Sequence, residues 1–322
     1  MQTKEQQTFI LPLLVASAII GATGLRGQSP TDSTESFSDR PLFRSHELSL
    51  APADTAGGGG AQAQPKEGED RDGLSKEELA KLAQNPVANL ISVPFQNNFN
   101  FGVGPNKVCQ YVLNVQPVIP ITLNDEWNLI TRWITPIIDQ PSPAPGVRSA
   151  SGLGDINPSF FLAPANPGKI IWGIGPTTTL PTATDPLLGT GMYQVGPSAV
   201  ALTIQGHWVF GALVNNQWSV AGWGGRNLNN FLLQPFVNYN LPNGWYLTSS
   251  PIITADWTAD HRDMWTVPLG AGMGKIVKLG GKLPLNLQLA AYDNVCTPRN
   301  GADWQLRFQV QILLPKAVFS RD

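Results

Sequence analysis

The sequence predicts an all-β protein, a transmembrane antiparallel β-barrel of about 12 strands preceded by a short amphipathic helix. Three observations lead to this fold class. Beyond residue 94, apolar and polar residues alternate with the period of a β-strand, the polar residues are mostly amides, and short connections alternate with long ones. A wall with one apolar and one amide face suits lipid on one side and a wet interior on the other.

The composition restricts the class of protein. The chain has 322 residues, of which 14% are charged and 42% hydrophobic, with 32 Gly and 28 Pro, a balance unusual for a soluble α/β enzyme. After the N-terminal segment no apolar run reaches the roughly 18 residues of a membrane-spanning helix, so membrane insertion must use strands. The net charge of −2 and the lack of a basic cluster argue against nucleic acid as a partner.

The N-terminal segment predicts export. Residues 1–24 combine Lys4, an apolar run that ends at Ala22, and the small residue Gly24, which is typical of a signal peptide. Residues 25–73 are rich in Ser, Gly, Pro and Asp and poor in large apolar groups, so they predict a disordered periplasmic leader. The expected location is the bacterial outer membrane.

Residues 74–93 predict the short amphipathic helix. The Ser75 hydroxyl can cap free backbone N–H groups and the Glu78 carboxylate can reach back, while Leu79, Leu82 and Ala83 follow at helical spacing. Two positions for this helix stay open: a plug inside the barrel or a periplasmic tether outside it.

Residues 94–322 are assigned to the barrel. In the last strand the apolar residues from Trp304 to Ile312 alternate with Gln305, Arg307 and further glutamines, so one face is apolar and the other polar. Side chains on such polar faces are the candidates for lining the lumen. They are Gln110, Asn114, Gln116, Arg132, Gln288, Arg307, Gln309 and Gln311.

The connections give an independent argument, because outer-membrane barrels have short periplasmic turns and longer outer loops. Tight turns are predicted at 124–125, 166–168, 205–206, 242–244 and 280–281, and longer connections at 140–152, 182–192, 216–229, 256–263 and 294–302. Three tryptophans begin strands directly after tight turns, and a fourth opens the last strand. These predicted membrane-interface aromatics are Trp127, Trp208, Trp245 and Trp304.

Prolines recur about once per predicted strand, although a closed sheet has no edge that tolerates them. They are Pro117, Pro136, Pro158, Pro176, Pro197, Pro235, Pro251 and Pro268. We expect each to mark a bulge or a constricted level of the wall, facing a plug or water.

No local signature of catalysis is present: the chain has no Gly-x-Ser-x-Gly, His-Glu-x-x-His or Cys-x-x-Cys motif. We therefore expect no enzyme activity, no catalytic residue, no cofactor and no metal. Among the histidines His46, His207 and His261, only His261 has charged neighbours on both sides. Cys109 and Cys296 lie far apart without metal-type spacing, and their role is not assigned.

Several stretches resemble a known family. Residues 84–98 (QNPVANLISVPFQNN), 152–158 (GLGDINP), 206–220 (GHWVFGALVNNQWSV) and 304–316 are similar to bacterial outer-membrane proteins labelled transporter or neuromedin U, grouped with the MetA-pathway phenol-degradation barrels. The resemblance implies an outer-membrane barrel that handles aromatic compounds and transfers no catalytic motif. The chain departs from it in its two cysteines and in the tail after Lys316, where Phe319 is nearest to the usual terminal aromatic.

The sequence thus predicts an outer-membrane channel or passive transporter for small apolar or aromatic solutes. Its expected partners are outer-membrane lipids, such solutes and the barrel-assembly machinery; the oligomeric state is not predicted. The interior charges Arg132, Arg307, Lys275 and Asp155 are too sparse to set a strong ion preference. Two alternatives stay open: a structural or adhesive barrel whose outer loops bind a partner, and a barrel-embedded lipid hydrolase with His261 as base.

Overall fold

The computed structural model describes residues 75–280 and 283–314. The predicted signal peptide (1–24) and leader (25–73) lie outside the described residues, as does the tail that contains Phe319. Within the described part, no helix has the length and apolar character needed to cross a membrane.

The predicted helix is α1 (Lys76–Ala83), and its first turn is closed by the expected reciprocal cap. The Glu78 backbone N–H donates to Ser75 Oγ at 3.1 Å, and the Ser75 N–H donates to Glu78 Oε2 at 2.8 Å. The helix buries Leu79, Ala80 and Ala83. The buried face therefore includes Ala80, which the sequence pattern did not predict, whereas the expected Leu82 is only partly buried.

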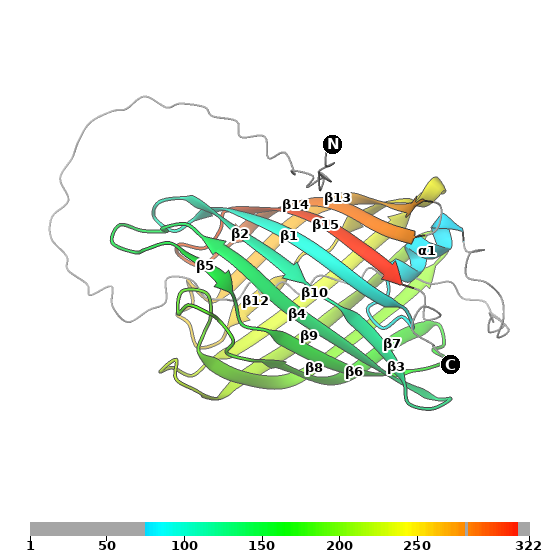
Figure 1. Cartoon of the computed structure of the whole chain (residues 1–322), viewed down its shortest axis with the longest axis horizontal. Coiled ribbons are helices and arrows are strands. Elements are labelled where there is room, and N and C mark those ends of the chain that lie inside the picture. Colours follow the sequence, from blue (N-terminus) through cyan, green and yellow to red (C-terminus); the bar gives the residue numbers. More distant parts are fainter. Residues whose placement is uncertain (1–74, 281–282, 315–322) are drawn as a thin grey trace, which may run out of the picture. The chain divides into compact units, whose positions relative to one another are not determined.

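The remaining described chain forms strands that pair antiparallel in one sheet (Figure 1). The strands are β1 (Ile91–Val103), β2 (Val108–Val115), β3 (Val118–Thr122), β4 (Trp127–Gln140), β5 (Ala150–Leu153), β6 (Asn157–Pro164), β7 (Ile170–Thr179), β8 (Met192–Gln205), β9 (Trp208–Gly222), β10 (Asn229–Asn240), β11 (Trp245–Ser249), β12 (Ile253–Asp256), β13 (Trp265–Leu279), β14 (Leu283–Cys296) and β15 (Trp304–Leu314). A 3-10 turn, η3 (Pro242–Gly244), joins β10 to β11.

Three strands of the barrel wall are each interrupted by a short break. Each consists of two consecutive segments: β2 with β3, β5 with β6, and β11 with β12. For example, Asn114 of β2 and Val118 of β3 both pair with β4, opposite Pro136 and Arg132. β15 pairs with β1 from Leu314 opposite Ile91, which closes the sheet. The result is a closed 12-strand antiparallel β-barrel, as the sequence predicts.

The wall has the two faces expected of a membrane barrel. In β15, Gln305, Arg307, Gln309 and Gln311 are buried, whereas Trp304 on the other face is 40% exposed. Around the barrel, as in β15, large apolar side chains are exposed and polar side chains are buried, which is the opposite of a soluble protein. Examples are Leu162, Ile174, Leu247, Met273 and Leu289. The exterior suits lipid and the polar side chains face inward.

Every one of the eight prolines lies where pairing is interrupted on at least one side. Pro117 and Pro251 lie in the breaks of the wall, and Pro268 lies at the bulge where β13 shifts register against β14. Pro136 and Pro158 flank the break at 154–156, and Pro235 lies opposite the break at 250–252.

Pro176 and Pro197 show the same one-sided pattern. They pair with each other across β7 and β8, but β6 pairs with β7 only at Ser159–Thr177 and Leu162–Ile174, and the β8–β9 register omits residues 196 and 197. The missing proline N–H thus falls on the irregular side of each strand. The expectation that pairing is irregular at each of these prolines is therefore confirmed, although a register shift lies at Pro268 alone among the eight. Nothing in the geometry assigns a plug or water to each proline.

The two-faced wall can be tested at the middle of β14, where Leu289 is 50% exposed and its neighbour Gln288 is 3% exposed. We expect Leu289→Lys to destabilise the barrel by about 2–4 kcal/mol, because a lysine there meets lipid. Gln288→Lys, whose side chain points inward, should cost clearly less. Urea unfolding in lipid vesicles measures both, and equal costs would contradict the assigned faces.

Candidate functional site

The candidate site is the barrel interior, where the predicted lumen residues gather. Seven of the eight candidates are buried: Asn114, Gln116, Arg132, Gln288, Arg307, Gln309 and Gln311. The eighth, Gln110, is partly buried and donates from Nε2 to Gln140 Oε1 at 2.6 Å. These side chains lie on the inward face, and their contact with a solute stays a prediction.

One hydrogen-bonded chain begins at Arg132 on β4. Its Nη2 donates to Gln116 Oε1 at 2.8 Å, and Gln116 Nε2 donates to Gln96 Oε1 at 2.6 Å. The Gln116 amide accepts a hydrogen bond through its oxygen and donates one through its nitrogen, so the two bonds polarise each other. The positive charge of Arg132 is thereby connected to β1.

A second set of contacts holds Arg307 on β15. Its Nε donates to Asn98 Oδ1 at 3.3 Å, Nη2 to Gln305 Oε1 at 2.9 Å, and Nη1 to the Ser250 carbonyl at 3.2 Å. The guanidinium carbon lies 4.8 Å from the centroid of the Tyr292 ring. Uncharged oxygens and an aromatic face thus fix the orientation of this buried cation.

Sequence reasoning missed the β1 part of this surface. Gln96, Asn98 and Asn100 are buried, but the run Gln96-Asn97-Asn98 hides the alternation, because Asn97 on the outward face is polar too. The outward neighbours Phe95, Phe99 and Phe101 carry the signal that could have found it.

A second region of the interior is apolar, which the sequence analysis also missed. Buried side chains from strands β3 to β12 form one cluster that comprises Val118, Ile130, Ile134, Phe161, Ala163, Val200, Leu213, Leu232 and Ile252. Leu202, Ile204, Val209 and Phe236 extend it. Where this cluster lies, both faces of the strands are apolar, so the alternation disappears and the inward side cannot be recognised from the sequence. Other inward positions of the same strands are polar, for example Ser159, Gln194 and Gln234.

The segment after α1 contributes to this apolar cluster. Val87 is a member of it, and a Cβ on Gly173 of β7 would lie 3.0 Å from Val87 Cγ1. The helix itself makes different contacts, because its apolar face packs on Ile276 of β13 and Leu313 of β15. Val87 therefore lies against the inner wall, at the strand position where Gly173 leaves room.

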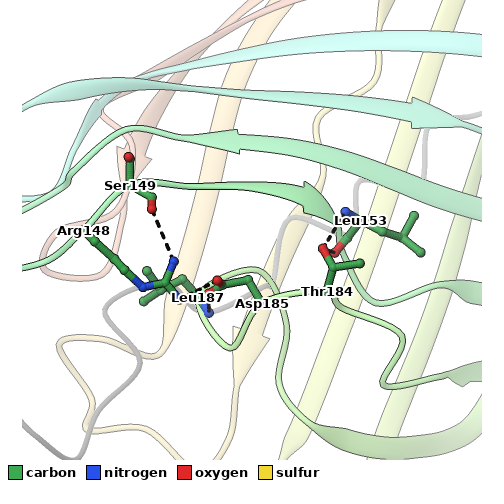
Figure 2. Close-up of polar contacts among 6 residues, drawn as sticks. All are labelled: Arg148, Ser149, Leu153, Thr184, Asp185 and Leu187. Atoms are coloured by element: carbon green, nitrogen blue, oxygen red, sulfur yellow. Dashed lines mark hydrogen bonds and ion pairs between the residues drawn. The ribbon is translucent and has the colours of Figure 1, made fainter.

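The long connections at the opposite end of the strands from α1 are tied to one another (Figure 2). Arg148, from the connection between β4 and β5, forms an ion pair with Asp185, from the connection between β7 and β8. The Leu187 N–H donates to Asp185 Oδ1 at 2.9 Å, and the Leu153 N–H donates to Thr184 Oγ1 at 3.1 Å. The Leu187 N–H and Arg148 lower the pKa of the Asp185 carboxyl.

Asp155 anchors the other part of the same connection. It is buried in the break between β5 and β6 and accepts from the Ala183 N–H at 3.2 Å and from the Thr190 N–H at 2.6 Å and hydroxyl at 2.9 Å. A Cβ at Gly189 would collide with its carboxylate. The expected interior charge Asp155 is thus engaged in holding a loop. Lys275, which the sequence analysis also placed in the interior, lies instead on the outward face of β13, over the ring of the exposed Trp245.

The four predicted interface aromatics are at least partly exposed, and each contacts another ring or a cation. The Trp127 and Trp172 rings meet edge to face with their centroids 6.0 Å apart, and the Trp208 and Tyr239 centroids lie 4.7 Å apart. Lys275 Nζ lies 4.4 Å from the centroid of the Trp245 ring, and the Trp304 ring stacks on Phe101 with a centroid distance of 4.2 Å. Amphipathic rings at strand ends are typical of membrane–water boundaries. Their contact with headgroups remains a prediction.

The histidines and cysteines do not gather at the interior surface. His207 and His261 are exposed in connections between strands, Cys109 is partly buried, and Cys296 is exposed at the end of β14. In the residues described, no group of three or more His, Cys, Asp or Glu side chains is arranged to hold a metal ion. His46 lies outside the described residues.

Comparison with solved structures gives outer-membrane barrels. The COG4313 outer membrane channel from Pseudomonas putida F1 is 16% identical, with a TM-score of 0.53 over 70% of this chain and 94% of that one. The NanC porin is 9% identical, with a TM-score of 0.46 over 69% of this chain and 99% of that one. Neither the family models nor the curated proteins gave a match. At 16% identity, the likeness to the channel supports the barrel fold.

The tie between the two long connections predicts a pH effect. Because the folded pKa of Asp185 is lowered, the ion pair with Arg148 contributes above the ordinary carboxyl pKa of about 3.9 and is lost as the pH falls through the lowered value. We expect hydrogen exchange in residues 180–191 to accelerate over that acidic range. In Asp185→Asn the exchange should be faster already at neutral pH, and an acid response as large as in the wild type would refute the assignment.

Proposed function

We propose that this barrel is a passive outer-membrane channel for small apolar or aromatic solutes. One observation carries the proposal: the interior combines an amide face, on β1, β2, β14 and β15, with a cluster of buried apolar side chains that extends from Val118 on β3 to Ile252 beside β12. A porin for ions or sugars has no need of a buried apolar wall, whereas an aromatic solute gains from leaving water along it.

The amide face supports the passage of a solute through the barrel rather than its tight binding there. Gln309 Nε2 on this face, and Gln234 Oε1 and Asn240 Oδ1 elsewhere in the interior on β10, find no hydrogen-bond partner among the described residues. Such atoms require water or a solute. A hydrated strip beside an apolar wall offers an aromatic solute a path on which neither its ring nor its polar group is left unsatisfied.

We propose further that the segment after α1 is the plug of this channel. Val87 packs on the apolar wall, and the fully buried Gln84 has neither its amide oxygen nor its nitrogen bonded within the described structure. A polar side chain buried in this way costs free energy, which favours a second position of the segment. Between the two positions left open by the sequence, these contacts support the plug.

Removing the plug should open the channel. We expect deletion of residues 75–90 from the otherwise complete protein to raise single-channel conductance severalfold, because Val87 no longer covers the inner wall. Planar-bilayer recordings of the refolded protein measure it. If deletion leaves the conductance unchanged, the segment is not a plug.

A point variant makes the same test without removing chain. Val87→Asp places a charge on the apolar cluster and should also raise the conductance, since the segment can no longer pack there. Asn89→Asp is the matched control, because it adds the same charge to the same segment at an exposed position. Equal effects of the two variants would mean that charge, and not packing at Val87, controls the channel.

A further inference from the structure

β6 and β7 are neighbouring strands of the wall, but they pair in register at only two positions. These are Ser159 opposite Thr177 and Leu162 opposite Ile174. On its other side, β7 pairs with β8 at every residue from Ile170 to Thr179. Neighbouring strands are held together by the hydrogen bonds of such pairs. The boundary between β6 and β7, the β6–β7 seam, is therefore joined by fewer backbone bonds than the boundary between β7 and β8.

Two prolines account for the sparse pairing across this seam. Both register pairs belong to one antiparallel register, in which Pro176 lies opposite Phe160. The same register places Pro158 opposite Thr178. Neither proline has an N–H to donate across the seam. The strands still touch, because a Cβ at Gly175 would collide with the Phe160 carbonyl oxygen. The seam is thus shut by close contact of the two backbones, with two donors of the ladder missing.

Side chains supply hydrogen bonds in the outer part of the seam, next to the long connections. Asn157 Nδ2 donates to the Thr178 carbonyl at 2.7 Å, and the hydroxyl oxygens of Ser159 and Thr177 lie 2.8 Å apart. Beyond Ser159, toward the end at which α1 lies, β6 has no further hydroxyl or amide side chain. The part of the seam nearer α1 therefore depends on the second register pair.

That part of the seam is apolar on both faces of the wall. It comprises residues 160–164 and 170–176, which include no charged, amide or hydroxyl side chain. On the inward face, Phe161 belongs to the apolar cluster. On the outward face, Leu162 is 37% exposed and Ile174 is 52% exposed. An apolar solute that crosses the wall here passes between the interior and the lipid without meeting a polar side chain of these two segments.

The plug segment covers the inner side of the same seam. A Cβ on Gly173 of β7 would lie 3.0 Å from Val87 Cγ1 and 3.3 Å from the Cβ of Phe161 on β6. Val87 and Phe161 also belong to one apolar cluster. Val87 therefore lies on the inward surface where the two strands meet. When the segment leaves the inner wall, it uncovers the seam as well as the lumen.

From this arrangement we infer that the β6–β7 seam is a lateral exit, through which apolar solutes pass from the barrel interior into the hydrocarbon of the outer membrane. The inference rests on the proposed function and deepens it by naming the route. Parting two strands in lipid leaves backbone groups without partners, which is costly. The cost is lower where prolines have already removed donors. An apolar solute gains more by entering hydrocarbon than by returning to water.

A disulfide across the seam tests the exit. The 2.8 Å between the Ser159 and Thr177 hydroxyl oxygens shows that cysteines at these positions can be bridged with little backbone movement. The pair Ser159→Cys and Thr177→Cys is placed in the full-length protein, in which Cys109→Ser and Cys296→Ser remove the native thiols. The protein is expressed in Gram-negative cells, and the probe is N-phenyl-1-naphthylamine, which fluoresces when it enters lipid. Oxidation should slow the probe uptake severalfold, and a reductant should restore it.

A second disulfide is the matched control. Ser198→Cys with Asn215→Cys joins a register pair of β8 and β9 whose side chains are also buried, and it should leave the uptake unchanged. Heat-modifiable gel mobility verifies that each variant is folded. The inference is overturned if the oxidised seam variant takes up the probe as fast as its reduced form, or if the control disulfide slows uptake equally.

A single substitution decides the question if the cysteine pair fails to fold. Pro176→Val returns an N–H to the seam and should slow probe uptake without any disulfide. Pro197→Val makes the same change at the register partner on β8, away from the seam, and should leave uptake as in the wild type. Unchanged uptake in a folded Pro176→Val variant would overturn the lateral exit.

The two proposals fail separately, because the disulfide closes the wall and leaves the lumen as it is. Conductance that rises after deletion of residues 75–90, together with probe uptake that the seam disulfide does not change, would leave the channel standing and reject the lateral exit. Uptake that the disulfide abolishes, in a protein silent in the bilayer with and without that segment, would support the exit and reject the plug.

Discussion

A continuous run of register pairs joins β15 to β1, from Ile91 opposite Leu314 to Phe101 opposite Trp304. In lipid every backbone N–H and C=O must be bonded within the protein, so an open edge at either strand would be costly. Closure by these pairs removes both edges and creates an interior. It also brings Gln96 and Asn98 of β1 beside Gln309 and Arg307 of β15, so the polar interior face depends on the same contact.

The closed wall tolerates its prolines because each irregularity is one-sided. Pro136 keeps its register with β2, and its carbonyl accepts from the Gly154 N–H at 2.9 Å across the break. Where the wall is interrupted at 250–252, backbone groups become available to the interior: the Ser250 N–H meets the Tyr292 hydroxyl at 3.2 Å and its carbonyl meets Arg307. A break that would weaken a soluble sheet here supplies hydrogen-bonding groups to the inner surface.

The sequence predicts those parts of the fold in which one strand face differs from the other. β15 is such a strand, and Gln305, Arg307, Gln309 and Gln311 lie on the inward face as expected. The apolar inner wall could not be predicted, because Val200 and Leu202 face inward on a strand whose outward residues are apolar as well. Val87 and Asp155 were beyond local reasoning for another reason. Their partners, the strand position of Gly173 and the loop at Thr190, are distant in sequence and only the closed barrel brings them near.

The chemistry of the interior follows from how the two buried arginines are held. Keeping a guanidinium inside a protein costs free energy unless its donors are engaged, and Arg307 engages two amide oxygens, a carbonyl and a ring. Apolar residues of similar volume would give a more stable wall. The amide oxygens and the Ser250 carbonyl hold the cation in place, and the apolar cluster begins two residues from that carbonyl, at Ile252. The polar and the apolar parts of the interior therefore meet at that level of the barrel.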